Sequence, residues 1–107
     1  MRPVDVLVRA GELASAGEPF ALATVVSVRR PASARRGDRA VVTAGGAVYG
    51  WVGGSCSEPT VVREALASLA DGESRLVSTE GSCASEGAVE ILVEPQLPAP
   101  LLAIVGE

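Results

Sequence analysis

The chain has 107 residues, an apolar content of 48% and a formal net charge of −4, with no histidine. This length and composition suit one small globular domain rather than a disordered chain. The acidic balance lacks the basic surface of a nucleic-acid-binding protein. The missing histidine excludes a Ser-His-Asp or Cys-His nucleophile and a histidine-ligated zinc site within this sequence.

The two cysteines, Cys56 and Cys83, allow at most one disulfide. No apolar run approaches the length of a membrane span, and the amphipathic N-terminus lacks the continuous apolar core of a signal peptide. These features predict a cytoplasmic protein with free thiols, because thiols in that compartment are kept reduced.

The first predicted element is a helix over Pro3–Ala16, because proline suits a first turn and Gly17 suits a left-handed cap. Helical spacing predicts one buried stripe on this helix, made by Val6, Ala10, Leu13 and Ala14. The next segment, Phe20–Val28, is nearly all apolar, which predicts a strand that is covered on both faces.

An arginine-rich loop, Arg29–Arg39, follows this strand. Two short strands, Ala40–Thr43 and Ala47–Val52, are expected next. A glycine turn at residues 44–46 joins them, because paired glycines permit the positive φ that a tight hairpin needs.

A second helix is predicted over Glu58–Asp71 and ends at Gly72. Its predicted buried face consists of Val62, Ala65, Leu66 and Leu69. Strands over Arg75–Thr79 and Ala88–Glu94 follow. In the last strand one buried face alternates with one partly wet face, made by Val89, Ile91 and Val93 and by Glu90, Leu92 and Glu94 respectively.

These elements predict an α/β fold of the α+β kind, a small mixed β-sheet of about five strands packed with two helices. Residues 1–94 form this domain, and the proline-rich residues 95–100 form an extended linker. Residues 101–107 have the pattern of a buried strand that has just begun, which indicates a second domain that is truncated or absent.

The segment Gly53-Gly54-Ser55-Cys56-Ser57 directly precedes the second helix, where Ser57 or Glu58 is the expected N-cap. Free backbone N–H groups and the helix dipole favour anion binding at such a position. A thiol in this environment has a lowered pKa, so Cys56 is a candidate soft nucleophile or metal ligand. Alternatively, Cys56 is a small buried side chain and the glycines only form a turn.

Two further features are candidates for binding. Cys83 lies among loop-forming residues, either as a packed thiol or as a partner of Cys56. The loop before the second strand holds more than half of the arginines, including Arg35 and Arg39, and arginine binds phosphate bidentately. Alternatively, these arginines are solvated and pair with acidic neighbours such as Asp38.

Three stretches carry a family resemblance: SARRGDRAVVT at 33–43, GWVGGSCSEPTVVREAL at 50–66 and CASEGAVEILVEP at 83–95. Together they resemble the N-terminal domain of the XdhC/CoxI family, accessory proteins that mature molybdenum hydroxylases such as xanthine dehydrogenase and aerobic carbon monoxide dehydrogenase. Ser55 stands where many members have glycine. The third stretch is closer to the CoxI type, which favours a client of the carbon monoxide dehydrogenase group.

The resemblance implies a protein that binds the molybdenum cofactor, as molybdopterin or its cytosine dinucleotide form. Such a protein supports sulfuration of the cofactor by a cysteine desulfurase and delivers it to a molybdenum hydroxylase apo-enzyme. Cys56 would contact the metal, residues 53–57 with Arg35 and Arg39 would hold the anionic part, and Cys83 is a further candidate contact. Residues 101–106 resemble the first strand of the Rossmann-like domain that members usually add.

A cofactor chaperone without catalytic turnover suits these residues best, because the chain offers no histidine and no specially placed carboxylate pair. Two alternatives stand beside it. Cys56 could carry a persulfide in sulfur transfer, or the domain could serve dimerisation and docking while a second domain holds the cofactor site. A homo-oligomer is expected because the sheet is predicted to expose apolar edges.

Overall fold

The structure is a computed structural model that describes residues 3–29, 34–52, 57–79 and 88–98. The described residues form two helices and five strands: α1 (Pro3–Ser15), β1 (Phe20–Val28), β2 (Arg39–Thr43), β3 (Val48–Gly50), α2 (Glu58–Asp71), β4 (Arg75–Ser78) and β5 (Val89–Gln96). Each element was predicted from the sequence, and β1 and α2 have the predicted bounds. β3 is shorter than expected at both ends.

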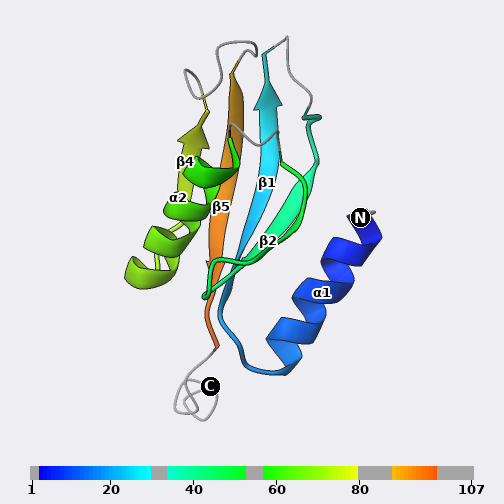
Figure 1. Cartoon of the computed structure of the whole chain (residues 1–107), viewed down its shortest axis with the longest axis vertical. Coiled ribbons are helices and arrows are strands. Elements are labelled where there is room, and N and C mark those ends of the chain that lie inside the picture. The colour runs from blue at the N-terminus through cyan, green and yellow to red at the C-terminus, as the bar shows by residue number, and fades with distance from the viewer. Residues whose placement is uncertain (1–2, 30–33, 53–56, 80–87, 99–107) are drawn as a thin grey trace, which may run out of the picture.

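The strands form one sheet in the order β3-β2-β1-β5-β4 (Figure 1). β5 lies between β1 and β4 and is antiparallel to both. β1 and β4 therefore run in the same direction without touching, and every pairing found among the described residues is antiparallel. The α+β class is confirmed, but the sheet is antiparallel where a mixed one was predicted.

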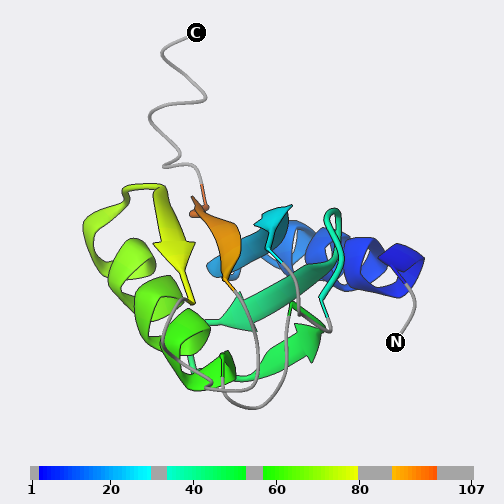
Figure 2. The same ribbon diagram turned by 90° about the horizontal axis from the view of Figure 1, so that it is seen from above.

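α2 covers one face of the sheet, and α1 lies on the opposite face (Figure 2). The face under α2 holds the larger core, built mostly from alanine and valine side chains: Ala21, Ala23, Val25, Ala40, Val42, Val77, Val89, Ile91 and Val93 from the strands, with Val61 and Ala65 from α2. Burial of this contiguous apolar surface is the main favourable term for the fold.

The buried face of α2 differs from the predicted one. Val61, Ala65 and Ser68 are buried, whereas Leu66 is 38% exposed. A buried serine is tolerated here because its hydroxyl donates a 2.6 Å hydrogen bond to the backbone oxygen of Glu73. Compared with the prediction, the buried face of α2 is thus shifted towards Val61. Packing against the sheet, and not hydrophobicity alone, determines which face is buried.

α1 covers only part of its face of the sheet. Val6 of α1 packs with Phe20 and Val41, and Ala10 and Leu13 are partly buried, as predicted. Ala14 is exposed, contrary to the prediction, because only a narrow stripe of the helix meets the sheet.

The same face is open over β5, β4 and the later part of β1. α1 contacts mainly β2 and β3 and meets β1 near Phe20, so among the described residues it leaves the rest of this face uncovered. Val26 of β1 is consequently exposed and Leu22 is only half-buried, which corrects the prediction that β1 is covered on both faces. Leu76 of β4 is 58% exposed on this open side.

β5 shows the predicted alternation, with buried Val89, Ile91 and Val93. The strand continues to Gln96, two residues into the segment predicted as a linker. Proline is accommodated at position 95 because β4 pairs with β5 only as far as Val93, so one side of β5 has no described strand neighbour there.

Candidate functional site

Three connections of the chain start and finish at one end of the sheet (Figure 1). Val28 at the end of β1 pairs with Val89 at the start of β5, and Ser78 at the end of β4 pairs with Glu90 beside it. Trp51, which follows β3, donates its backbone N–H to the oxygen of Arg39 at 3.1 Å. The segments 29–38, 51–57 and 79–88 therefore meet the sheet at the same end.

The N-terminus of α2 lies at this end. Ser57 is the N-cap, one of the two predicted positions, and its backbone oxygen accepts the N–H of Val61 at 3.1 Å. The Ser57 side chain makes no capping hydrogen bond, and Pro59 contributes no N–H. Among the described residues no side chain caps the first-turn N–H groups of Glu58 and Thr60, which lie at the positive end of the helix dipole.

The residues on both sides of the Gly53–Cys56 segment are buried. Val52 is 5% exposed and packs in the α2-side core with Ala34 and Val61, and Ser57 is 6% exposed. Ala34 belongs to the arginine loop, so this loop and the cysteine segment share one hydrophobic contact region. Gly53, Gly54, Ser55, Cys56 and Cys83 themselves lie outside the described residues.

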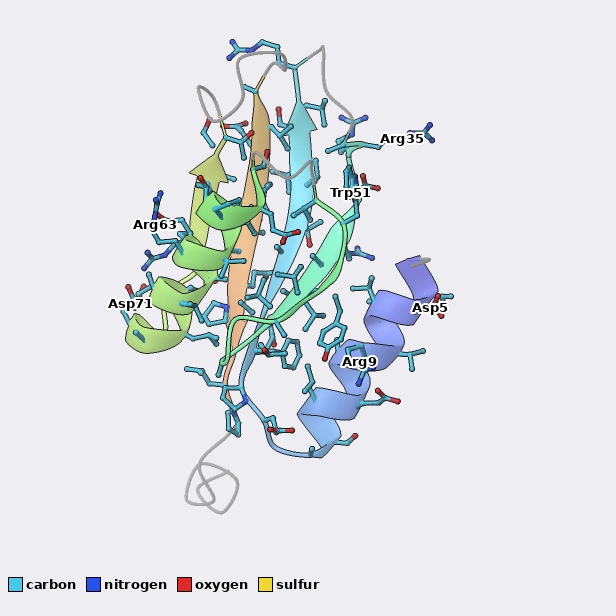
Figure 3. The ribbon with its side chains drawn as sticks, in the orientation of Figure 1. Asp5, Arg9, Arg35, Trp51, Arg63 and Asp71 are labelled. Carbon is cyan, nitrogen blue, oxygen red and sulfur yellow. The ribbon has the colours of Figure 1, made fainter. Side chains whose placement is uncertain are left out.

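The acidic residue of the arginine loop, Asp38, bonds to the loop backbone rather than to an arginine side chain. The Arg35 N–H donates to Oδ2 of Asp38 at 2.9 Å, and the Asp38 N–H donates to the Arg35 oxygen at 3.0 Å. Arg35 extends away from the body of the molecule (Figure 3). Within the described part of the chain, the guanidinium groups of Arg35, Arg36 and Arg39 form no ion pair. Asp38 therefore does not neutralise these three arginines, but Arg35 and Arg36 are exposed to solvent, as the alternative also held.

Arg39 and the start of α2 lie on opposite faces of the sheet. Ala40 and Val42 point into the α2-side core, and side chains alternate along a strand, so the half-buried Arg39 points to the other face. Its neighbour there is Trp51, which is 47% exposed. Arg39 and the N-terminus of α2 thus share one end of the sheet, but they lie on opposite faces rather than together as predicted.

Gly50 sets the path of the chain into this region. Its φ of 108° lies in the left-handed range, and a Cβ there would lie 2.5 Å from the Arg39 oxygen and 2.9 Å from Cγ2 of Val6. Only glycine permits this close backbone approach. The close approach places Trp51 beside Arg39. The sequence analysis gave Trp51 no role, although it is the single tryptophan of the chain.

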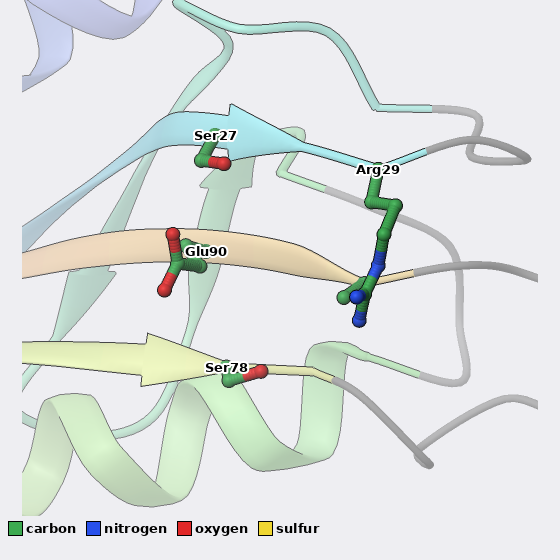
Figure 4. A pocket seen from close by; sticks show the side chains of 5 residues that line it. Ser27, Arg29, Ser78 and Glu90 are labelled. Atoms are coloured by element: carbon green, nitrogen blue, oxygen red, sulfur yellow. The ribbon is translucent and has the colours of Figure 1, made fainter.

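A second polar region was not predicted. A hollow of about 290 Å³ is lined by Ser27, Arg29, Ser78, Ala88 and Glu90, at the ends of β1, β4 and β5 (Figure 4). The alternation of β5 indicated that Glu90 is on the wetter face, but its neighbours come from strands that are distant in sequence.

Two searches of the described residues were negative. No group of three or more Cys, Asp or Glu side chains could hold a metal ion among them. No helix among them is long and apolar enough to cross a membrane.

The chain was compared with known proteins. The model of the XdhC and CoxI family matches residues 13–80. A crystal structure described as a xanthine dehydrogenase from Bacillus halodurans is similar in fold, with a TM-score of 0.73 and 21% identity. The similarity covers 89% of this chain and 30% of that one, so this chain spans less than a third of that protein's length. No curated protein sequence matches the chain.

Proposed function

The chain belongs to the XdhC and CoxI family, and from that premise we propose that it is an accessory protein of molybdenum hydroxylases. In this proposal the protein binds the molybdenum cofactor as cargo, holds it for sulfuration by a cysteine desulfurase and hands it to the apo-enzyme. The client is a hydroxylase of the xanthine dehydrogenase and carbon monoxide dehydrogenase group. The chain performs no net reaction on its cargo.

The observation that supports the proposal most is the meeting of three segments at one end of the sheet. The arginine loop and the cysteine segment pack on one core through Ala34 and Val52. The segment that contains Cys83 begins and ends beside them, after Thr79 and before Ala88. The shared end of the sheet supports the proposal that these segments, which are distant in sequence, contribute to one binding site.

The polar groups at this end suit an anionic cargo. Arg35 and Arg39 have no ion pair within the described residues, so a phosphate would not have to displace a carboxylate. The uncapped first turn of α2 adds backbone N–H donors and positive potential. Cys56, directly before Ser57, would supply a soft thiolate for the metal, since a helix N-terminus favours the thiolate form.

The test is a titration of the chain with molybdenum cofactor, followed by co-elution of molybdenum. We compare the wild type with Arg35→Gln/Arg39→Gln and with the charge-matched control Arg9→Gln/Arg63→Gln, whose side chains lie on the helices. Each charge-assisted hydrogen bond that is lost should weaken binding at least about tenfold. The control should bind like the wild type.

Two results would contradict the proposal. Equal affinity of the two double variants would mean that the arginine loop does not hold the anionic part. Absence of saturable binding to the wild type would mean that this chain does not hold the cofactor, and its role would then be docking or dimerisation.

A further inference from the structure

The hollow at the ends of β1, β5 and β4 lies on the sheet face away from α2. Five described residues line it: Ser27, Arg29, Ser78, Ala88 and Glu90. Figure 4 shows the side chains of Ser27, Glu90 and Ser78 in a row across the three strands, with Arg29 closer to the strand ends. Its volume, about 290 Å³, is near the lower end of the range for small-molecule pockets.

The register of the sheet builds this row. β1 contains an irregularity between Val25 and Ser27, which leaves Val26 as the extra residue and puts Ser27 directly opposite Glu90. On the other side, Ser78 of β4 is also directly opposite Glu90. A carboxylate is therefore flanked on both sides by a hydroxyl group.

The carboxylate of Glu90 has no hydrogen-bond donor among the described residues. It is half-buried, and within the described residues it accepts no hydrogen bond and forms no ion pair. Arg29 and Ser78 each have an interaction of their own. Glu90 is thus the group that most needs a donor from a ligand, because a carboxylate has two oxygens that can accept a pair of N–H groups side by side.

We propose that this hollow binds a planar heterocycle through two adjacent N–H donors, the amino-oxopyrimidine edge that pterin and guanine share, with Glu90 as the acceptor. The guanidinium of Arg29 at the same hollow disfavours a cationic ligand such as an amine. A neutral ring with N–H donors satisfies Glu90 without opposing Arg29. The volume suits one ring system rather than a whole nucleotide.

The inference deepens the proposed function and rests on it in one respect: the ring is taken to be the pterin of the cofactor. The hollow and the start of α2 share one end of the sheet but lie on opposite faces. The ring site is therefore distinct from the start of α2, and it can be tested with a pterin that carries neither metal nor phosphate.

The experiment is equilibrium dialysis of the full chain against free pterin, with the wild type, Glu90→Gln and Glu94→Gln. Glu94 is the matched control, because it lies on the same strand and the same face but is paired with Leu22, outside the hollow. Glu90→Gln keeps the shape and replaces one acceptor oxygen by a donor. Pterin affinity should fall at least about tenfold in Glu90→Gln and stay unchanged in Glu94→Gln. A thermal melt of each variant verifies folding.

Competition arms define the ligand. Guanosine should compete with pterin, whereas cytidine and glycine should not. Equal pterin affinity in the two glutamine variants, no pterin binding to the wild type, or competition by glycine would overturn the inference. If Glu90→Gln still binds the complete molybdenum cofactor like the wild type, the inference fails while the proposed function stands. If the wild type binds pterin but not the complete cofactor, the proposed function fails instead.

Discussion

The two ends of α2 satisfy their polar groups in different ways. At the C-terminal end Gly72 adopts the left-handed conformation, and its N–H donates to the Ser68 oxygen at 2.8 Å. The Ser68 hydroxyl and the Asp71 carboxylate both bond to the backbone of Glu73, and Asp71 also pairs with Arg75 of β4. Every one of these groups finds its partner within the chain.

The N-terminal end has the opposite character. Ser57 is buried but does not cap the helix with its side chain. Arg35 and Arg39, at the same end of the sheet, have no ion pair within the described residues. Hydrophobic contacts of Ala34 and Val52 hold this end together instead. The contrast indicates that the polar groups at the C-terminal end are satisfied within the chain, whereas under the proposed function those at the N-terminal end would be available to a ligand.

The largest predicted effect concerns Gly50, whose backbone leads to the end of the sheet where α2 begins. Gly50→Ala would combine an unfavourable φ with overlap against the Arg39 oxygen and Val6. We expect it to lower the free energy of unfolding by about 3 kcal/mol. Gly45→Ala is the control, because a Cβ there meets only Thr43, at 3.9 Å. Thermal unfolding should give a midpoint lower by roughly 10–20 °C for Gly50→Ala. Similar midpoints for the two variants would refute the close approach.

A smaller effect is predicted at the C-terminal end of α2. Gly72→Ala places a side chain at a φ of 74° and should cost about 1 kcal/mol in urea unfolding. Gly11→Ala in α1 should instead stabilise the protein by about 0.5–1 kcal/mol, since nothing lies within 4 Å of its Cβ. Neither variant should change cofactor affinity. A loss of affinity in Gly72→Ala would break the division between the two ends.

The smallest predicted effect is a pH dependence at Asp71. The Glu73 backbone N–H, and then Arg75, hold the pKa of Asp71 below its ordinary value of 3.8. The unfolded chain therefore takes up the proton first as the pH falls. The stabilisation is complete above the unfolded pKa and is lost as the pH falls through the folded one.

Asp71→Asn removes this charge while keeping an acceptor oxygen. The stability difference between the wild type and Asp71→Asn in urea unfolding should be present at pH 7 and shrink below the unfolded pKa. A difference that stays constant across that range would mean that the charge of Asp71 does not stabilise the C-terminal end of α2.

Local patterns predicted the elements of the fold well. The proline near the start of α2 and the glycine after it gave its bounds, and the alternation along β5 gave its buried face. The buried face of α2 was predicted less well because Ser68 is buried through a bond to Glu73, which hydrophobic spacing does not reveal. The sequence also did not predict that β5 pairs antiparallel with both β1 and β4, because this pairing depends on contacts between strands that are distant in sequence.

The candidate site divides in the same way. Residue chemistry indicated Arg35, Arg39 and the segment before α2 from the sequence alone. The hollow at Glu90 could not be predicted, because the irregularity in β1 and the pairing with β4 create it. Candidate residues on one segment can be recognised in the sequence, whereas a hollow formed across several strands depends on the register of the sheet.

The most direct test of the account is a titration of the chain with molybdenum cofactor, using the wild type and Cys56→Ser side by side. The single tryptophan, Trp51, reports through its fluorescence, and co-elution of molybdenum gives the stoichiometry. The account predicts saturable binding to the wild type that collapses in Cys56→Ser. Unchanged binding in Cys56→Ser, or no binding to the wild type, would contradict the assignment of the cofactor to the segment before α2.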